Sequence, residues 1–343
     1  MSGPAGGLQL SHMAREALEA PQAVARFLDA NAGALTELGA RLRGAPPPLA
    51  LTSARGSSDH AAGYFAYLAE ILLGVPCCSI GASVVSVYGA RLRAKGALAL
   101  TISQSGKSPD IVALQQAARA AGALCVALVN TEDSPAARAA DIVLPLCAGP
   151  ERSVAATKSF IVSLAAAAAI VAAWREDAAL MAAVRALPEV LARAALARWP
   201  EFTDMAVAAD RLYVLGRGPA LPVAAEIALK LKETCAIHAE AYSLAEVMHG
   251  PLELLGDGFP VLVLSPEDRS RASAIEAIAR LRATGARVLA VEPGGLASVR
   301  TGHALLDPIA MVQTAYLCIE SAARQRGRDP DRPRHLQKIT ETT

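Results

Sequence analysis

Three ionisable residues recur at helical spacing within a largely apolar stretch: Glu226, Lys230 and Glu233. Positions i, i+4 and i+7 share one face of an α-helix. Pro219 and Pro222 are tolerated only near a first turn, so we expect the helix to begin between them. Charges on a partly buried face are costly unless they pair or do chemistry. A solvated stripe of ordinary ion pairs has the same spacing and stays an alternative.

A polar turn, Ser103-Gln104-Ser105-Gly106-Lys107-Ser108, joins an apolar run to a helix expected from Pro109. Free backbone N–H groups, the positive end of a helix dipole and three hydroxyls suit an anion. The spacing of a Walker loop is absent, so a phosphate monoester fits better than a nucleoside triphosphate. A hydroxyl-capped turn without ligand is the plainer interpretation.

A second turn with hydroxyl groups, Arg55-Gly56-Ser57-Ser58-Asp59-His60, also joins an apolar run to a helix. Its Ser58 is expected to reach the same anion from an adjacent strand, whereas His60 fits a supporting role better than a catalytic one. Lys158 begins the most apolar segment and is as well explained as a helix-start charge. Further on, Glu246 and His249 stand at i, i+3 before Gly250-Pro251 ends a helical run.

Short apolar runs alternate with helix-like segments after Pro46-Pro47-Pro48, which predicts a parallel α/β sheet with right-handed crossovers. The expected strands are Leu49–Ser53, Leu98–Ile102, Cys125–Asn130 and Ile142–Leu146.

The pattern recurs 162 positions later, pairing Gly56 with Gly218, Ser103 with Ser265, Val129 with Val291 and Val143 with Leu305. Such a constant offset indicates two copies of one α/β unit. The first copy has the polar turn and the second has the charged helix, so a single site at their junction is expected.

Composition excludes several classes of function. The net charge of +1 gives no basis for binding nucleic acid or an anionic membrane. The apolar run from Ile161 to Trp174 is too short to span a bilayer and predicts a buried helix. Six cysteines without a CxxC pattern are interpreted as small core residues in a reducing compartment. No signal peptide is evident at the N-terminus, so a cytoplasmic location is expected.

The chain resembles proteins of the sugar isomerase (SIS) family, specifically the isomerase half of glucosamine-6-phosphate synthase and stand-alone aminosugar-phosphate deaminases. The matching segments follow the family's order over residues 50–338: RGSSDHA, SQSGKSPD, AATKSF, GRGPALPVAAEIALKLKETCAIHAEAY, AEVMHGPLELL and DPDRPRHLQK. The resemblance implies two tandem SIS subdomains, each a parallel sheet flanked by helices in a three-layer, flavodoxin-like αβα arrangement. The expected divisions are an N-terminal helical segment (1–46), a first subdomain (47–175), a linking helix (176–198), a second subdomain (199–325) and a C-terminal tail that acts as a lid (326–343).

The resemblance also implies roles for individual residues. Glu233 would move a proton between C1 and C2 of the sugar, and Lys230 would assist it. His249 would open the sugar ring from the partner subunit of a homodimer with shared active sites. Lys338 would close over the sugar. The sugar phosphate would be held by Ser57, Ser58, Ser103, Gln104, Ser105 and Ser108, while Glu226 would contact the sugar or organise the site.

The family's chemistry requires no metal or other cofactor. The expected activity is conversion of glucosamine 6-phosphate and water to fructose 6-phosphate and ammonia. Deglycation of a fructosamine phosphate or plain isomerisation is the alternative among enzymes, and a non-catalytic phosphosugar sensor is the alternative outside them. Met1-Ser2 offers no N-terminal cysteine nucleophile, so glutamine is not expected to supply ammonia. Ala156 replaces a serine of the synthase and Ser108 replaces a threonine.

Overall fold

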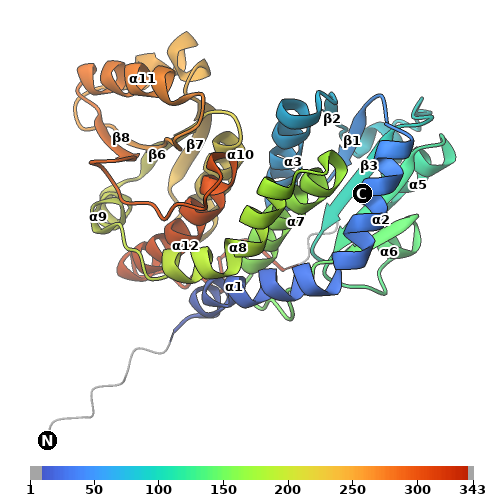
Figure 1. The fold of residues 1–343 in the computed structure, drawn as a ribbon. Helices are drawn as coiled ribbons and strands as arrows, with labels where there is room; N and C mark the ends of the chain where they lie inside the picture. The colour runs from blue at the N-terminus through green and yellow to red at the C-terminus, as the bar shows by residue number, and fades with distance from the viewer. Residues whose placement is uncertain (1–9, 339–343) are drawn as a thin grey trace, which may run out of the picture.

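A computed structural model describes residues 10–338 of the 343-residue chain. Two parallel β-sheets, each covered by helices, form two lobes (Figure 1). The elements of the first lobe and its N-terminal helices are α1 His12–Ala30, α2 Ala32–Gly44, β1 Ala50–Ser53, α3 Ser57–Leu73, β2 Cys77–Ser79, α4 Ser83–Ser86, β3 Leu98–Ser103, α5 Pro109–Ala120, β4 Leu124–Val129, α6 Pro135–Arg138, β5 Ile142–Pro145 and α7 Lys158–Arg175.

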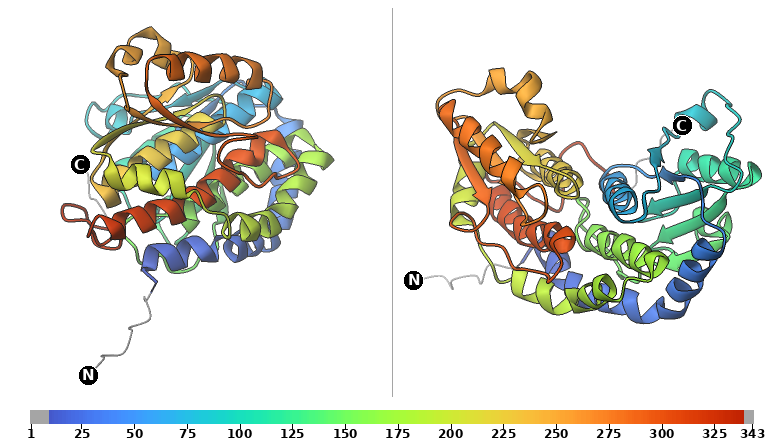
Figure 2. Two further views of the ribbon diagram at one scale, coloured as in Figure 1. Left: turned by 90° about the vertical axis from the view of Figure 1, so that its left-hand side faces the viewer. Right: turned by 45° about the horizontal axis from the view of Figure 1, so that its top comes forward.

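The second lobe follows a connecting helix, α8 Ala178–Ala194. Its elements are α9 Pro200–Ala208, β6 Arg211–Gly216, α10 Ala220–Lys230, η1 Leu231–Cys235, β7 His238–Ser243, η2 Glu246–His249, η3 Pro251–Leu254, β8 Pro260–Leu264, α11 Arg271–Ala283, β9 Arg287–Val291, η4 Ala304–Leu306 and α12 Asp307–Gln325. Figure 2 shows the two sheets standing apart, with helices of both lobes packed between and beneath them. The expected α/β class with two parallel sheets is confirmed.

The strand orders are β2-β1-β3-β4-β5 and β7-β6-β8-β9. In each sheet the second strand of the chain lies on one side of the first strand, and the later strands follow in order on its other side. The order therefore reverses between β1 and β3 in one sheet and between β6 and β8 in the other. Ligands of open parallel sheets bind outside the carboxyl ends of the strands at such a reversal.

One of the expected strand assignments is wrong, and the two edge strands β2 and β7 were not predicted. β2 was missed because it is a three-residue edge strand that is largely exposed and so has no apolar run. Leu305 was matched with Val143 of β5 but lies in the 3-10 turn η4, so the second sheet has no counterpart of β5. The other pairs agree: Gly56 and Gly218 have φ of +55° and +56°, and β4 and β9 end at Val129 and Val291.

The core follows the apolar pattern of the sequence, with one exception among the cysteines. α7 is the single described helix long and apolar enough to cross a membrane, and 89% of it is buried inside the protein. All six cysteines are unpaired, but Cys78 is exposed on the edge strand β2, so its assignment to the core was wrong. The exposure of Cys78 was not predicted because β2 itself was not recognised.

Candidate active site

A cavity of about 280 Å³ lies at the strand-order reversal between β1 and β3, beyond the carboxyl ends of both strands. We call it the first cavity. Eight of the predicted site residues line it: Ser57, Ser58, Ser103, Gln104, Ser105, Ser108, Glu233 and Lys338. Its other walls are residues that the sequence did not single out as functional, namely Arg55, Gly56, Ile102, Ile111, Val154, Ala156, Leu336 and Gln337.

The turn Ser103–Ser108, which we call the cradle, is held in shape by its own hydroxyl groups. Ser103 Oγ accepts the N–H of Gly106 at 3.0 Å and Ser105 Oγ accepts that of Lys107 at 3.3 Å. A hydroxyl that accepts in this way still has its own hydrogen to donate to a ligand. Gly106 has φ of +63°, and a Cβ there would lie 2.3 Å from Ser134 Oγ. The turn thus has no room for a side chain at this position.

Two helices begin at the first cavity, which makes it favourable for an anion. α5 begins at Pro109, as predicted, and α3 begins at Ser57. The positive ends of both helix dipoles therefore lie beside the cradle. Arg55 connects the two turns, because its Nε donates to the buried carboxylate of Asp110 at 2.8 Å. A phosphate monoester suits this arrangement of hydroxyls and dipoles.

The charged residues of α10 meet as their spacing predicted. Lys230 Nζ lies 3.5 Å from Glu226 Oε1 and is also hydrogen-bonded to Glu233 Oε2. Glu226 and Lys230 are almost completely buried, whereas the Glu233 side chain keeps 19% of its surface exposed and reaches the first cavity. Glu233 lies in η1, a single π-turn that follows the α-helix. Glu226 itself is buried and does not line the first cavity, so the geometry favours the organising role among its two predicted roles.

Glu226 is the centre of a network that joins the two lobes. Its carboxylate accepts from Ser57 Oγ at 3.1 Å and from Tyr316 Oη at 2.9 Å, and His60 Nδ1 lies 3.0 Å away. His60 therefore supports a buried carboxylate, as the sequence suggested. Tyr316 was missed, because it lies on α12, 90 positions away, and has no polar neighbour in the sequence.

The electrostatics of this network keep both partners charged. Burial alone would raise the pKa of Glu226, but the Lys230 ammonium outweighs it, with help from His60 and Tyr316, and the net shift is downward. Burial likewise works against the charged form of Lys230, but Glu226 and Glu233 together raise its pKa. Lys230 is thus held as an ammonium beside the Glu233 carboxylate, which it positions by their hydrogen bond.

The C-terminal tail, residues 326–338, forms one wall of the first cavity. The Asp331 carboxylate accepts the N–H groups of His12 and Met13 at 2.7 and 2.8 Å, at the first turn of α1. Lys338 Nζ donates to Ser153 O at 2.6 Å and lies 3.6 Å from the buried carboxylate of Glu151. The described part of the tail is therefore held against α1 and the segment around Ser153. Residues 339–343 of the expected lid lie outside the described residues.

The wall segment 151–157 is shaped by buried carboxylates. Glu151 accepts the N–H groups of Thr157 and Ser159, and Glu16 of α1 accepts those of Arg152 and Ser153. Burial raises the pKa of Glu16. The chain offered no local signal for these contacts, because Glu16 is more than a hundred residues from its partners.

Two predicted residues lie elsewhere. His249 is exposed on η2, a single 3-10 turn rather than the longer helical run expected there, and it does not line the first cavity of its own chain. Lys158 is buried at the start of α7 and is hydrogen-bonded to Glu19 of α1, away from the first cavity. Lys158 thus fits the plainer interpretation of a structural charge.

The model of the SIS domain matches residues 50–173 and 206–294, and the chain belongs to this family. A glutamine–fructose-6-phosphate aminotransferase from Methanothermobacter thermautotrophicus is 35% identical over 297 residues. The match covers 82% of this chain and 50% of the relative, so the chain spans about half the length of the curated relatives it matches.

Two solved structures show the same fold. A protein from Silicibacter pomeroyi, provisionally described as a phosphosugar isomerase, is 47% identical with a TM-score of 0.90, covering 94% of this chain and 100% of that one. A glucosamine-6-phosphate deaminase from Thermotoga maritima has a TM-score of 0.77 at 23% identity, covering 97% and 100% of the two chains. The similarity to the Thermotoga maritima structure shows a shared fold only. The first structure, with the aminotransferase match, agrees with membership of the SIS family.

Proposed function

We propose that the protein is a deaminating aldose–ketose isomerase that converts glucosamine 6-phosphate and water to fructose 6-phosphate and ammonia. The observation that supports this most strongly is the position of Glu233. Its carboxylate faces the same cavity as the cradle and is held there by the ammonium of Lys230. A phosphate handle and a positioned base in one cavity are what proton transfer on a sugar phosphate needs.

The proposed sequence begins with the phosphate in the cradle, hydrogen-bonded by Ser103, Ser105 and Ser108. In the open-chain aldose, Glu233 takes the proton from C2 and returns it to C1. This shift turns the aldehyde at C1 into a CH₂OH group and leaves an imine at C2. Addition of water to that imine and loss of ammonia give the ketose, so one water is consumed for each ammonia released.

Lys338 supplies a reactive amine in this scheme. It lies on the wall of the first cavity, hydrogen-bonded to a backbone carbonyl. When it leaves that carbonyl, its amine can condense with C2, expel ammonia and be released by water, which gives the same overall balance. Retention of Lys338 together with Glu233 favours an enzyme over a sensor, which needs the cradle alone.

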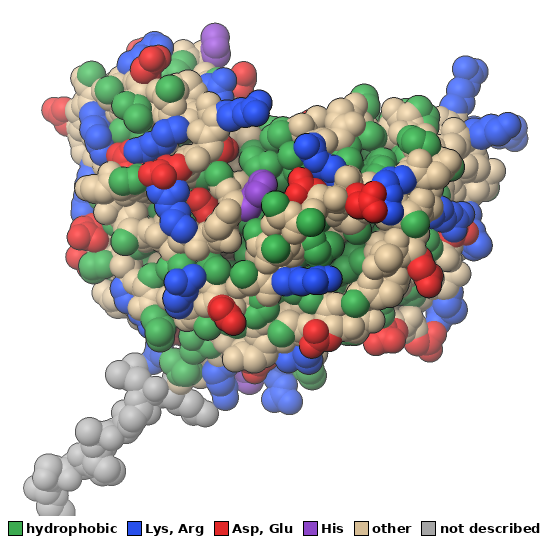
Figure 3. Space-filling view, viewed as in Figure 1, with side chains coloured by type: hydrophobic (Ala, Val, Ile, Leu, Met, Phe, Trp, Pro, Cys, Tyr) green, Lys and Arg blue, Asp and Glu red, His purple; other side chains and the backbone are tan. Residues whose placement is uncertain are grey.

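The proposal includes a homodimer with shared active sites. His249 does not line the first cavity of its own chain, which favours a second copy as the source of the histidine that opens the sugar ring. Large apolar side chains are exposed at Val87, Tyr88 and Leu254, and Tyr88 keeps 80% of its surface accessible. Apolar side chains also gather in the hollow between the lobes (Figure 3). Such surfaces favour association with another chain.

The deciding experiment is ammonia release from a panel of 2-amino-2-deoxyhexose 6-phosphates, with glucose 6-phosphate and a fructosamine phosphate assayed in parallel. We expect ammonia and fructose 6-phosphate in equal amounts from glucosamine 6-phosphate. Interconversion of hexose phosphates without ammonia release would favour plain isomerisation. Binding of the sugar phosphates without any turnover would favour the sensor.

A further inference from the structure

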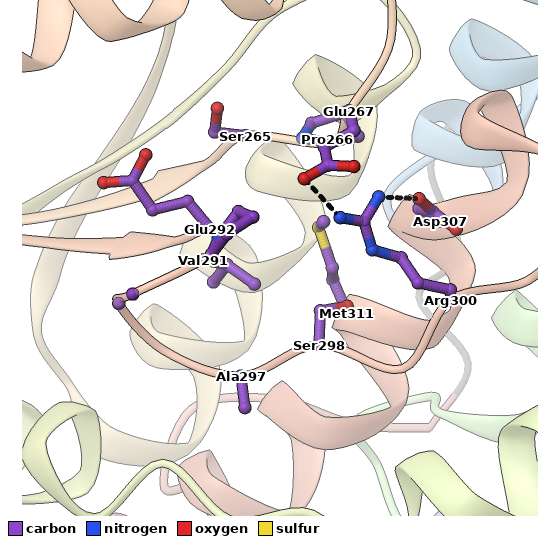
Figure 4. A pocket seen from close by; sticks show the side chains of 13 residues that line it. Ser265, Pro266, Glu267, Val291, Glu292, Ala297, Ser298, Arg300, Asp307 and Met311 are labelled. Carbon is purple, nitrogen blue, oxygen red and sulfur yellow. Dashed lines mark ion pairs between the residues drawn. The ribbon is translucent and has the colours of Figure 1, made fainter.

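A second cavity, of about 320 Å³, lies in the other lobe beyond the carboxyl ends of β8 and β9 (Figure 4). We call it the second cavity. Its size is within the range of small-molecule sites, and its place at the carboxyl edge of a parallel sheet is where such sites form. It shares no lining residue with the first cavity.

The second cavity is present because the two halves of the chain differ after their last matched strands. In the first half, the chain that follows β4 forms α6 and then β5, which pairs with β4. The corresponding residues after β9 form a loop and the turn η4 instead. This loop is tightly fixed: Leu296 N donates to Ala290 O at 2.8 Å, and a Cβ on Gly295 would lie 2.4 Å from that oxygen. The wall is therefore formed in advance of any ligand.

The charges that line the second cavity are already paired. Arg300 bridges Glu267 and the buried Asp307, and both ion pairs appear in Figure 4. Glu292 is held by Arg271 at 2.9 Å. Three carboxylates and one guanidinium thus line the space, so negative charge predominates among the lining side chains. A phosphate group would be repelled here, in contrast to the first cavity.

The remaining lining groups suit hydroxyls. Ser265 Oγ accepts from Arg271 at 2.8 Å and keeps its hydrogen to donate. The buried Ser298 hydroxyl has no hydrogen-bond partner within residues 10–338, and its side chain points from the loop toward Met311. Val291, Ala297 and Met311 add an apolar surface. Alternating donors, acceptors and apolar patches match a compound that carries many hydroxyl groups.

We propose that the second cavity binds a small polyhydroxyl ligand without phosphate, of the monosaccharide class. Carboxylates of Glu267 and Glu292 accept from its hydroxyls, Arg300 donates to them, and Met311 contacts its C–H face. Asp307 and Met311 place this ligand against α12, the helix whose Tyr316 holds Glu226. This inference does not depend on the reaction proposed for the first cavity.

The test is saturation-transfer NMR of the full chain with glucose, glucosamine and glucose 6-phosphate as probes. Two matched variants fill one cavity each: Ala297→Trp the second and Ala156→Trp the first. We expect glucose and glucosamine to give signals that Ala297→Trp abolishes and Ala156→Trp preserves. In the Ala156→Trp variant the first cavity is filled, and the second cavity repels a phosphate group. Glucose 6-phosphate should therefore bind this variant at least about tenfold more weakly than glucose does.

A further variant, Glu267→Gln, lies on the half-exposed rim and is expected to fold, so it tests the charged acceptor without filling space. We expect it to weaken glucose binding about tenfold. The proposal is overturned if no probe binds the parent at tens of millimolar, if Ala156→Trp removes the glucose signal while Ala297→Trp keeps it, or if glucose 6-phosphate binds the second cavity as well as glucose does. Thermal melting of each variant checks the fold.

Discussion

At the scale of residues, the proposed chemistry depends on one exposed carboxylate supported by a buried chain of partners. Glu233 reaches the first cavity, Lys230 contacts it from behind, and Glu226 holds Lys230. Ser57, His60 and Tyr316 in turn satisfy the Glu226 carboxylate. A buried ion pair with its remaining lone pairs satisfied is rigid, and removal of one partner leaves an uncompensated charge.

The first prediction concerns Glu233→Gln. The variant keeps the size of the side chain but removes the base, so the fold should survive while proton transfer stops. We expect deuterium incorporation at C2 of glucosamine 6-phosphate in D₂O to fall by at least ~10²-fold. A folded variant with parental incorporation would exclude Glu233 as the proton carrier. Glu246→Gln, at an exposed glutamate of η2, serves as the matched control.

The second prediction concerns the stability contributed by Glu226. Glu226→Gln leaves Lys230 buried beside one carboxylate and should cost about 3–5 kcal/mol at neutral pH. Because the folded pKa of Glu226 is lowered, its contribution is present above the unfolded value of about 4.3 and is lost as the pH falls through the folded value. Urea midpoints of parent and variant should therefore differ widely at pH 7 and converge in acid. An equal gap at both pH values would contradict this.

At the scale of elements, the first cavity is built where five segments meet, one of which is the wall segment 151–157. The turns that begin α3 and α5 supply hydroxyls and dipoles, η1 supplies the carboxylate, and the tail closes one side. The tail is anchored by Asp331 at the first turn of α1. The two halves of the chain thus contribute different parts, the anion site from one and the acid–base group from the other.

The third prediction compares Ser103 with Ser265, the residue at the corresponding position of the second half, which serves as the control. Ser103→Ala removes a hydroxyl from the cradle, and we expect it to weaken binding of a sugar phosphate by roughly 1.5–3 kcal/mol with a smaller change in turnover. Ser265→Ala alters the corresponding position of the second lobe, where the hydroxyl accepts from Arg271. Calorimetric titration with fructose 6-phosphate should separate the two variants. Equal affinities for both would remove Ser103 from the phosphate site.

At the scale of the whole molecule, the lobes are locked together through the site itself. Glu226 of α10 is bonded to Ser57 and His60 of α3, and Tyr64 of α3 donates to Leu305 O of the second lobe at 2.7 Å. The site is therefore a product of the packing between lobes, and relative movement of the lobes would disturb it. His249 is the one proposed catalytic residue outside this arrangement.

The fourth prediction tests the shared active sites. Chains with Glu233→Gln and chains with His249→Ala should each be inactive alone. After re-equilibration, hybrid dimers should regain part of the activity, because one of their two sites contains both native residues. Mass spectrometry of differently tagged chains checks that hybrids form. Hybrids that form without any activity would show that His249 serves its own chain or has no catalytic role.

Local patterns of the sequence were enough to predict many of the residues that line the first cavity. Helical spacing brought Glu226, Lys230 and Glu233 to one face, and polar turns after apolar strands located the cradle, because both features depend on backbone geometry over a few residues. The same reasoning predicted the two parallel sheets. It failed at β2, which has too few buried residues to leave a pattern, and at Leu305, where an apolar residue serves a turn as readily as a strand.

The tertiary structure alone decided which distant residues complete the site. Tyr316 meets Glu226 because α12 packs against α10, and Glu16 holds the wall of the first cavity because α1 crosses beneath it. It also showed that Glu226 is buried behind the first cavity and that His249 lies outside the first cavity of its own chain. Such contacts join residues about a hundred positions apart, and they follow from how helices of the two lobes pack, which no periodicity along the chain records.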